Sequence, residues 1–363
     1  MKTIVSKSDL RDAVSHILPA VAVKPGTPIL AGIYLRAEQS GLTLRATNFE
    51  LDITAKIPAN VEVEGECIAT GKHLSAIVNK LGGDVVTLID ENSQLTIRSE
   101  AASFDILTFD PGDFPKAPLI NDATSFRIHR NDLRELIRRT VFACSKDQSR
   151  PVFTGVNFVL NGTTVTAVGT NTARIAIVTG KIFDEASANV VIPTATLNAI
   201  QFALDVNSVI DVEFDKSHAV FAFDNLRIIT RFIDGTFPPA NKVIPESCAT
   251  TAEVDIAELR AAIDRIQIIS SEHNDKKVDM AFTQDGLEIS AISYNVGKAV
   301  EHVDADVKGD DLMIAFNYNY LLDVLKILDG KTCTFGMNQS LSPALIKGAD
   351  EDFVYVITPL RTH

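Results

Sequence analysis

The segment RPVFTGVNFVLNGTTVTAVGTNTARIAI, residues 150–177, alternates apolar and polar side chains on both sides of Asn161-Gly162. Alternation with a period of two is typical of β-strands, and Asn-Gly favours a tight turn between them. The segment therefore predicts a β-hairpin. A second segment, TPILAGIYLRAEQSGLTLRATNFELDI, residues 27–53, has the same form. The chain thus carries one kind of hairpin at two distant places.

A single offset of 123 residues relates the two hairpins and continues well beyond them. It aligns Pro28 with Pro151, Gly32 with Gly155, Thr47-Asn48 with Thr170-Asn171, Asp9-Leu10-Arg11 with Asp132-Leu133-Arg134, Leu74 with Leu197, Gly112 with Gly235, and Phe114-Pro115 with Phe237-Pro238. Because the offset stays constant over more than 100 residues, the sequence predicts duplication of a whole domain rather than a shared local motif.

A third, fainter copy follows in the last part of the chain. DIAELRAAIDRI (255–266) resembles HRNDLRELIRRT (129–140), DGLEISAISYN (285–295) resembles a hairpin strand, and NYLLDVLKIL (319–328) resembles the second helix of the repeat. The sequence therefore predicts three domains of about 120 residues, at 1–122, 123–248 and 249–363. The joints between them are short, so we expect the domains to pack in series.

Each unit contains the same order of elements. A short strand leads into an amphipathic helix, alternating strands follow, and a second helix and further strands close the unit. In the middle unit, the apolar stripe of the first helix is formed by Leu133, Leu136, Ile137 and Val141. LTLRAT, VVTLID and LTIRSE alternate as half-buried antiparallel strands do. The predicted fold class is therefore α+β, with one domain type used three times.

Composition narrows the class of protein further. Apolar residues make up 46% of the chain, which is enough for each domain to bury a core, and no run is long enough to span a bilayer. The start of the chain has no apolar core of a signal peptide. The four cysteines are scattered without a CxxC pair, which favours reduced structural thiols: Cys67, Cys144, Cys248 and Cys333. These features predict a cytoplasmic protein.

No constellation of catalytic residues stands out. The histidines fall at unrelated places in the repeats, and HxxxH, HExxH and GxSxG are absent. GECIATGKH (65–73) is similar to a phosphate loop, but the glycine spacing differs and His73 stands where Ser or Thr would ligate magnesium. A strand-to-helix turn is the better interpretation of that stretch. The sequence therefore predicts no catalytic residue, no cofactor and no metal site.

The charges are distributed unevenly. The net charge of −13 argues against a nucleic-acid partner at first sight, since phosphate binding needs clustered Lys and Arg. However, the six predicted helices together carry +2, so the rest of the chain carries −15. Arg130, Arg134 and Arg138 recur every four residues and predict one basic helix face, and Lys72 and Lys80 flank another helix. Such a face is either an ordinary solvated surface or a surface that contacts the phosphates of a polyanion weakly. In the second case it would not recognise the bases.

Taken together, these motifs carry a family resemblance. Three tandem units, the Asp-Leu-Arg helix starts, RPVFTGV, GTNTARIAI, IDGTFPPANKVIP, FNYNYLLDVL and the closing YVITPLR resemble the bacterial DNA polymerase III β sliding clamps. The resemblance spans essentially the whole chain. It implies DNA-clamp domains with helices lining a pore and antiparallel sheets outside, and a ring formed by a head-to-tail homodimer. It also implies a non-catalytic processivity factor that encircles duplex DNA without sequence preference.

The resemblance implies a hydrophobic pocket between the second and third domains that accepts short linear peptides. The expected partners are the polymerase α subunit, the clamp loader, repair polymerases, ligase and mismatch-repair proteins. Carried over by position, the pocket residues are Phe153, Thr170, Thr172, Arg174, Ile175, Pro238, Lys242, Val243, Asn317, Tyr320, Leu341, Val356, Thr358, Pro359, Leu360 and Arg361. Apolar side chains would receive the anchors of the peptide, while Arg174, Asn317 and Arg361 would hold its polar atoms. The matching residue for Arg174 in the first copy is Leu51, so we expect one working pocket.

Two further sets of residues follow from the resemblance. The residues expected to approach DNA are Lys24, Lys72, Lys80, Arg130, Arg134, Arg138, Lys146, Gln148 and Arg150. The residues expected at the dimer interface are Phe104 and Ile106 of one subunit, which would face Ile268 and Ile269 of the other.

The chain also departs from the family pattern. Thr358 and Leu360 stand where the family commonly has Met, Thr362-His363 replace a hydrophobic end, and SSEHNDKK (270–277) is unusually polar for the rim of the pocket. These differences predict a shifted peptide preference. From the residues alone, three repeats are also compatible with a monomeric ring, an open array, a peptide-binding scaffold that never encircles DNA, or a hydrolase built from scattered carboxylates.

Overall fold

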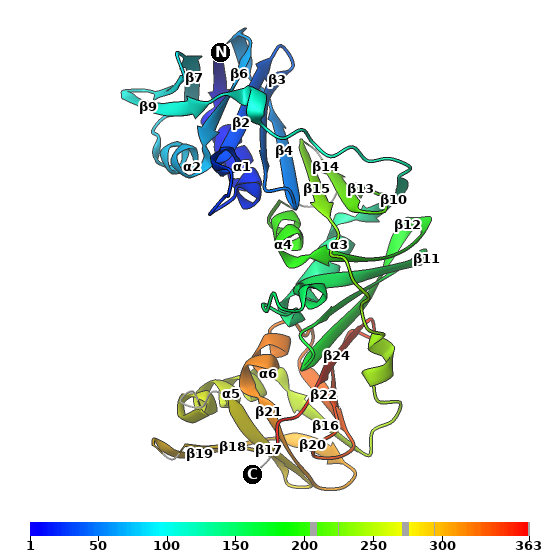
Figure 1. Cartoon of the computed structure of the whole chain (residues 1–363). Coiled ribbons are helices and arrows are strands. Elements are labelled where there is room, and N and C mark those ends of the chain that lie inside the picture. The colour runs from blue at the N-terminus through cyan, green and yellow to red at the C-terminus, as the bar shows by residue number, and fades with distance from the viewer. Residues whose placement is uncertain (204–208, 224, 271–275, 294, 362–363) are drawn as a thin grey trace. The chain divides into compact units, whose positions relative to one another are not determined.

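The structure of the chain, a computed structural model, describes residues 1–203, 209–223, 225–270, 276–293 and 295–361 (Figure 1). The chain divides into two compact units. The first comprises Met1–Asn131, Ile182–Ala186 and Ala195–Phe232, and the second comprises Asp132–Lys181, Ser187–Thr194 and Ile233–His363. This division differs from the three repeats found in the sequence. The domain boundaries expected from the repeats therefore stay a prediction.

The helices repeat with the offset found in the sequence. Helices α1 (Lys7–Ile17) and α2 (Gly71–Lys80) begin 123 residues before α3 (Arg130–Arg138) and α4 (Thr194–Ala203). The 3₁₀ turns η2 (Pro28–Ala31) and η5 (Pro151–Thr154) are related in the same way. The last repeat contributes α5 (Ile256–Ser270) and α6 (Tyr318–Leu325). The duplication predicted from the sequence is thus confirmed in the element order, with the third repeat aligned less closely.

In the described residues of the first unit, the strands form one sheet of 13. Its spatial order is β10-β13-β14-β15-β4-β3-β2-β6-β9-β8-β7-β1-β5. Because β15 pairs with β4 in an antiparallel register, strands of the first and second repeats join in one sheet. The strands are β1 (Lys2–Ser6), β2 (Gly32–Glu38), β3 (Gly41–Thr47), β4 (Leu51–Ile57), β5 (Asn60–Val63), β6 (Gly65–Thr70), β7 (Val85–Glu91), β8 (Gln94–Ser99), β9 (Ala102–Phe109), β10 (Thr124–His129), β13 (Val209–Phe214), β14 (His218–Phe223) and β15 (Leu226–Arg231).

Two sheets form the second unit, with seven and four strands. The larger has the order β11-β12-β24-β23-β22-β16-β20, and the smaller has the order β19-β18-β17-β21. Pairing of β12 with β24 joins strands of the second and third repeats. The strands are β11 (Gly155–Thr170), β12 (Arg174–Pro193), β16 (Thr250–Asp255), β17 (Lys277–Thr283), β18 (Gly286–Ser293), β19 (Gly297–Val303), β20 (Ala305–Lys308), β21 (Leu312–Asn317), β22 (Thr332–Met337), β23 (Ala344–Lys347) and β24 (Phe353–Ile357).

The two predicted hairpins differ in one detail. In the first copy, β2 and β3 pair directly, with Glu38 opposite Gly41. In the second copy, β11 is continuous over the same positions and no loop separates its two arms. Gly162 lies within β11 at φ 61° and supplies the left-handed residue at the predicted turn. Glycine adopts this conformation without a steric cost, which explains why a glycine stands at this position of the strand.

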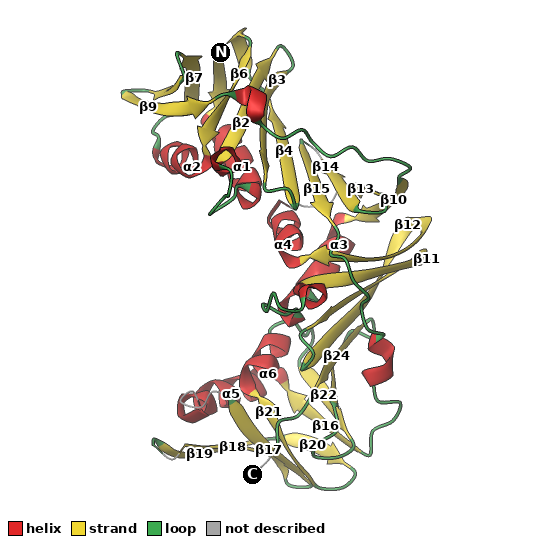
Figure 2. Cartoon of the chain, in the orientation of Figure 1, coloured by secondary structure: helices red, strands yellow, loops and turns green. Residues whose placement is uncertain are grey.

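The helices cover one face of each sheet (Figure 2). Ser6 caps α1 by accepting a hydrogen bond from the backbone N–H of Asp9, and Leu10, Ala13, Val14 and Ile17 form its buried stripe. This stripe packs against β3 and β4, and α1 also contacts α2. Of the four residues predicted for the stripe of α3, Leu133, Leu136 and Ile137 are buried, whereas Val141 lies beyond the helix, in the 3₁₀ turn Val141–Ala143, and is half-buried. The apolar stripes read from the sequence therefore form the cores.

Two equivalent glycines explain one of the shared motifs. A Cβ atom on Gly32 would lie 2.3 Å from the Ile68 side chain, and one on Gly155 would lie 2.7 Å from the backbone oxygen of Ile192. Both positions follow a 3₁₀ turn and open a strand. The repeated glycine is therefore required by close packing at the start of the strand.

All four cysteines are free, and three of them are buried. Burial raises the pKa of Cys144 to about 12, and burial likewise raises the pKa of Cys333 to about 12. These thiols are structural rather than reactive. None of the described helices has the length and apolarity that a membrane span requires. Among the described residues, no group of three or more His, Cys, Asp or Glu side chains could hold a metal ion.

Candidate functional site

The turn between β11 and β12 places the first set of expected pocket residues. The Thr170 hydroxyl donates to the backbone oxygen of Arg174 at 2.7 Å and accepts from the N–H of Thr172 at 3.1 Å. The Asn171 carboxamide oxygen accepts two backbone N–H groups, including that of Arg174 at 3.1 Å. Thr172 has φ 76°, and its counterpart Phe49 has φ 71°. The repeated Thr-Asn pair therefore builds the same turn in both copies and fixes where Arg174 leaves it.

Arg174 lies at the centre of the site and is 7% exposed. One terminal nitrogen donates to the Asp323 carboxylate at 2.7 Å, and the other donates to the backbone oxygen of Phe142. The guanidinium carbon lies 4.3 Å from the ring centroid of Tyr320 and 5.4 Å from that of Phe142. The Nε atom is buried and has no hydrogen-bond partner in the described part of the chain. Arg174 is therefore a fixed element of the wall with one unused donor.

Tyr320 connects α6 to this wall. Its hydroxyl accepts from the Asn171 side chain at 3.1 Å, and its backbone oxygen accepts from the Tyr355 hydroxyl at 3.0 Å. Asn317 caps the start of α6 by accepting from the N–H of Asn319 at 3.0 Å. Burial raises the pKa of Tyr355, although the neighbouring Arg174 opposes the shift, so this hydroxyl stays protonated and remains a donor. The ring of Tyr320 is half-buried, with one face on Arg174.

The last strand and the residues after it form another wall. Val356 is buried and lies opposite Ile175 in the pairing of β12 with β24. Thr358 donates from its N–H and from its hydroxyl to the backbone oxygen of Ala173, at 2.9 and 2.8 Å. The N–H of Leu360 donates to a backbone oxygen of β21 at 2.8 Å. These bonds bring Ile175, Val356 and Thr358 to the turn that carries Arg174.

The other expected pocket residues are less constrained. Phe153 is half-buried and meets Phe237, the neighbour of Pro238, edge to face at 6.0 Å. Val243 is 40% exposed and Leu341 is 62% exposed. Such exposed apolar side chains suit a rim that closes on a ligand. Within the described residues, no side-chain hydrogen bond or ion pair ties these residues to Arg174 or Tyr320: Pro238, Lys242, Val243, Leu341, Pro359 and Arg361. Most of the polar stretch expected at the rim, and the residues after Arg361, lie outside the described residues.

The equivalent place in the first copy is filled differently. Leu51, the counterpart of Arg174, is buried. Its neighbour Asp52 binds Arg45 at 2.6 Å, and Arg45 also donates to the backbone oxygen of Pro115 at 2.7 Å. The cavity left between Thr47, Asp52 and Pro115 measures about 40 Å³. A space of this size holds a water molecule rather than an apolar anchor.

The predicted basic face of α3 is corrected by the structure. Arg130 was expected to be solvated, but it is 3% exposed and its guanidinium lies over the Phe223 ring at 5.3 Å. It occupies the first position of α3, directly after β10, where the side chain folds onto the sheet. Arg134 is half-buried. Arg130 is therefore not available to a phosphate group.

Arg138 is engaged in an ion-pair network. It pairs with Glu135 at 2.6 Å, approaches Asp329 at 3.5 Å, and donates to the backbone oxygen of Ile327 at 3.1 Å. The next residue, Arg139, is 7% exposed and binds Glu135, Asp329 and Asp350. Burial would raise the pKa of the Glu135 carboxyl, but the hydrogen bond and charge of Arg138, together with Arg139, outweigh it and lower that pKa. The charge of Arg138 is thus largely neutralised by its neighbours.

The other expected DNA-contacting residues are exposed. Lys24 lies in the loop before η2, and Lys72 and Lys80 lie on α2. Lys146, Gln148 and Arg150 lie in the loop before η5. A charged side chain that is exposed can reach a phosphate at little cost to the fold. That these six residues approach DNA stays a prediction.

The expected interface residues are partly exposed apolar side chains. On β9, Phe104 lies opposite Ile97 and Ile106 lies opposite Leu95, so both point toward the buried side of the sheet. Phe104 nevertheless keeps 42% of its surface exposed. On α5, Ile268 is 67% exposed and Ile269 is half-buried. Isolated exposed apolar side chains are ordinary on a protein surface. Here the exposed side chains adjoin buried core residues, so each forms an apolar surface continuous with the core.

Sequence reasoning missed four partners of Arg174, which are Asp323, Phe142, Asn171 and Tyr355. For Asp323 a signal existed, because it follows Tyr320 by three residues and so shares its helix face. The repeat marks Asn171 as a turn residue, and nothing in that pattern indicates its role in the site. Nothing in the local pattern indicated Phe142, which contributes a backbone oxygen.

The fold defines an α+β protein built from repeated domains, and the residues around Arg174 form a candidate site in its second unit. Three family models match the chain: the DNA polymerase III β subunit N-terminal domain over residues 1–118, the central domain over 127–239, and the C-terminal domain over 241–361. The β sliding clamp of Bacillus subtilis is 32% identical over 378 residues, with both chains covered completely.

Solved structures give the same result. The crystal structure of the Bacillus subtilis DNA polymerase sliding clamp matches with a TM-score of 0.94 and 31% identity, and covers all of both chains. The β subunit of DNA polymerase III from Thermotoga maritima matches with a TM-score of 0.95 and 25% identity, again over both whole chains. The chain therefore belongs to the family of the bacterial DNA polymerase III β subunit, the β sliding clamps. Membership confirms the predicted family, the α+β fold with three clamp domains, and the prediction of a non-catalytic processivity factor.

Proposed function

We propose that two copies of the chain pair head to tail into a ring that encircles duplex DNA and tethers the replicative polymerase. The observation that carries this proposal is the agreement between the 123-residue repeat and the complete coverage of a sliding clamp at 32% identity. A ring holds DNA by topology, so it needs only weak phosphate contacts and tolerates an acidic surface. The working compartment is the cytoplasm, at the nucleoid, and the three domains are those delimited at 122 and 248.

In this proposal, the site around Arg174 receives short linear peptides from the polymerase α subunit, the clamp loader, repair polymerases, ligase and mismatch-repair proteins. Apolar walls come from Phe153, Ile175, Val356 and Leu360. The fixed position of Arg174 supports the assignment, because its guanidinium is held by Asp323 and the backbone of Phe142 and carries the Tyr320 ring that forms one side of the site. Arg174 is then chiefly a structural support for Tyr320 rather than a solvated contact.

The experiment that tests the proposed function is primer extension on a long single-stranded template, with the clamp loader and the polymerase of the same organism. The chain should lengthen the products made in one binding event many-fold, and an excess of the polymerase's own clamp-binding peptide should abolish the gain. If product length does not change in the presence of chain and loader, the processivity role is wrong. Extension without the loader serves as the control.

For DNA contacts, we expect the exposed loop before η5 to matter more than α3. The double change Lys146→Glu and Arg150→Glu should lower the yield of loaded clamp several-fold and increase its sensitivity to salt, with an unchanged melting temperature. Arg138→Glu should instead lower the melting temperature, since it places a carboxylate beside Glu135 and Asp329. Loading yield at two salt concentrations and thermal unfolding check both results. Unchanged loading by the double variant would contradict the assignment of this loop.

A further inference from the structure

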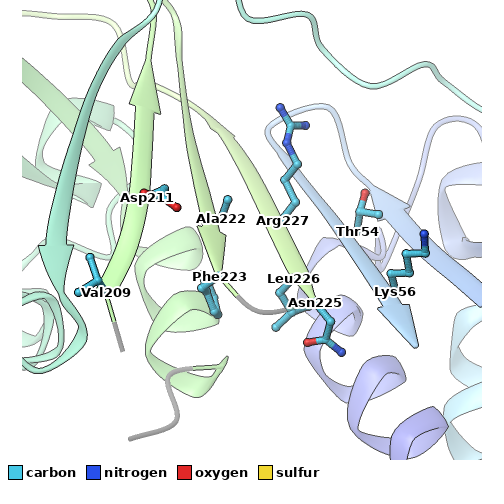
Figure 3. A pocket seen from close by; sticks show the side chains of 9 residues that line it. All are labelled: Thr54, Lys56, Val209, Asp211, Ala222, Phe223, Asn225, Leu226 and Arg227. Carbon is cyan, nitrogen blue, oxygen red and sulfur yellow. The ribbon is translucent and has the colours of Figure 1, made fainter. Parts of the chain in front are cut away.

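A groove that none of these roles uses crosses four strands of the first unit (Figure 3). We call it the β4–β15 groove. It is a shallow, open depression of about 570 Å³, lined by Thr54, Lys56, Val209, Asp211, Ala222, Phe223, Asn225, Leu226 and Arg227. The strand register sets Asp211 opposite Ala222, Ala222 opposite Arg227, and Arg227 opposite Thr54. These side chains therefore form one row on one face of the sheet.

The groove has a cationic end and an end that combines apolar side chains with one carboxylate. Lys56 and Arg227 are exposed diagonal neighbours on β4 and β15, and neither has an ion pair or side-chain hydrogen bond in the described part of the chain. Thr54 and Asn225 add a hydroxyl and an amide beside them. At the other end lie Val209, 44% exposed, Ala222 and the exposed carboxylate of Asp211. An acidic segment would therefore place its carboxylates at the Lys56–Arg227 end and an apolar side chain at this one. Two adjacent unpaired cations are notable in a chain with net charge −13.

The second unit shows that the fold does not require this charge. By the 123-residue offset, Lys56 corresponds to Thr179, which lines a cavity of about 330 Å³ beside α3. That cavity contains the carboxylates of Asp132, Glu135, Asp350 and Asp352. Its buried cation, Arg139, is already paired. This cavity lies beside α3, whereas the β4–β15 groove lies on the sheet face away from α1, so the two are not equivalent surfaces. Only the residue exchange carries over: the second repeat has Thr179 where the first has Lys56.

The groove lies on the sheet face away from α1. Along β4, Thr54 and Lys56 alternate with Ile53, Ala55 and Ile57, which are buried on the face that α1 covers. Successive strand residues point to opposite faces. If the helices face the DNA, as the proposed function holds, the groove faces away from it. A nucleic acid is thus the less suitable occupant, and a protein segment is the more suitable one.

From these observations we propose that the β4–β15 groove binds an acidic, extended peptide segment of a partner protein. Carboxylates of the segment would pair with Lys56 and Arg227, and an apolar side chain would contact Val209 and Ala222. Long, exposed cations attract such a segment from a distance and hold it through charge-assisted hydrogen bonds. The statement that the groove faces away from DNA rests on the proposed function. The pairing of Lys56 and Arg227 with carboxylates does not.

Fluorescence anisotropy with two labelled probes tests the proposal: Asp-Val-Asp-Val-Asp and its charge-reversed form Lys-Val-Lys-Val-Lys. The full-length chain should bind the acidic probe, and Lys56→Glu with Arg227→Glu should weaken this binding at least tenfold while strengthening binding of the lysine probe. A matched control, Lys216→Glu with Lys298→Glu, changes the net charge equally at exposed positions outside the groove and should leave the affinity for the acidic probe within twofold.

Equal affinity of the groove variant and the unmodified chain for the acidic probe would overturn the proposal, as would equal weakening by the control pair. Displacement of the acidic probe by a duplex oligonucleotide would also overturn it, since the groove would then be a nucleic-acid surface. Retention of the groove variant on circular DNA at the unmodified level supports a role separate from encirclement. If the unmodified chain itself fails to be retained, the ring proposal fails while the probe affinities still decide on the groove.

Discussion

Replacing Tyr320 with alanine should weaken binding of a labelled peptide from the polymerase α subunit at least tenfold, about 1.4 kcal/mol or more. The ring covers the guanidinium of Arg174 at 4.3 Å, and its hydroxyl holds the Asn171 side chain at 3.1 Å. Removing it strips one wall from the site and exposes the Arg174–Asp323 pair to water. Fluorescence anisotropy on the purified chain measures the effect.

The matched control is Tyr320→Phe, which keeps the ring over Arg174 and loses only the hydroxyl. We expect a loss of a few-fold at most, because the aromatic surface contributes most of the contact. The mass of the assembly in solution should not change in either variant. If Tyr320→Ala binds the peptide as tightly as the unmodified chain, the peptide site lies elsewhere.

Replacing Phe104 or Ile268 with aspartate should dissociate the dimer at micromolar concentration. Both are apolar and substantially exposed, at 42% and 67%, so the single chain can fold with the new charge in water. In a head-to-tail ring, each substitution falls in both interfaces, and each interface would bury an unpaired carboxylate. Light scattering should report a mass near 39.4 kDa rather than twice that value.

Leu119→Asp is the control for this prediction. Leu119 is 82% exposed and lies outside the expected interface, so the same chemical change there should leave the mass of the dimer unaltered. A dimer that persists in both the Phe104 and Ile268 variants would contradict the interface assignment. A monomeric mass for the unmodified chain would contradict the two-subunit ring itself.

The repeat made most of the fold predictable. A constant offset requires equivalent residues to have equivalent roles, and the Thr-Asn turn, the glycine at the strand start and the helix positions all recur 123 residues apart. These features depend on contacts close in the sequence or on local conformation. For this reason these features could be predicted from one sequence.

The environment of α3 was not predictable in the same way. Helical periodicity identified the buried residues Leu133, Leu136 and Ile137 correctly, but it extended the helix to Val141, which lies beyond its end. It could not show that Asp329 and Asp350, about 200 residues downstream, neutralise Arg138 and Arg139. Nor could it show that Arg130 lies over Phe223. A pattern within one helix reports which face is apolar, but contacts distant in sequence decide which of the polar residues stay solvated.

The partner site shows the same division. The resemblance placed Arg174 and Tyr320 in one site, and the structure brings them within 4.3 Å. Their hydrogen-bond partners came from the structure alone, because Asp323 and the backbone of Phe142 reach Arg174 from other segments. As a result, Arg174 changes from a residue expected to hold polar atoms of the peptide to one that supports the wall.

The most direct measurement of the central claim is retention on circular and linear DNA. The labelled chain is loaded by its clamp loader onto a nicked circular plasmid, freed of loader by gel filtration, and divided into samples with and without one restriction cut. The chain should remain with the intact circle and leave the linearised plasmid from its ends. Equal loss from both forms, or equal retention on both, would contradict a ring that encircles DNA.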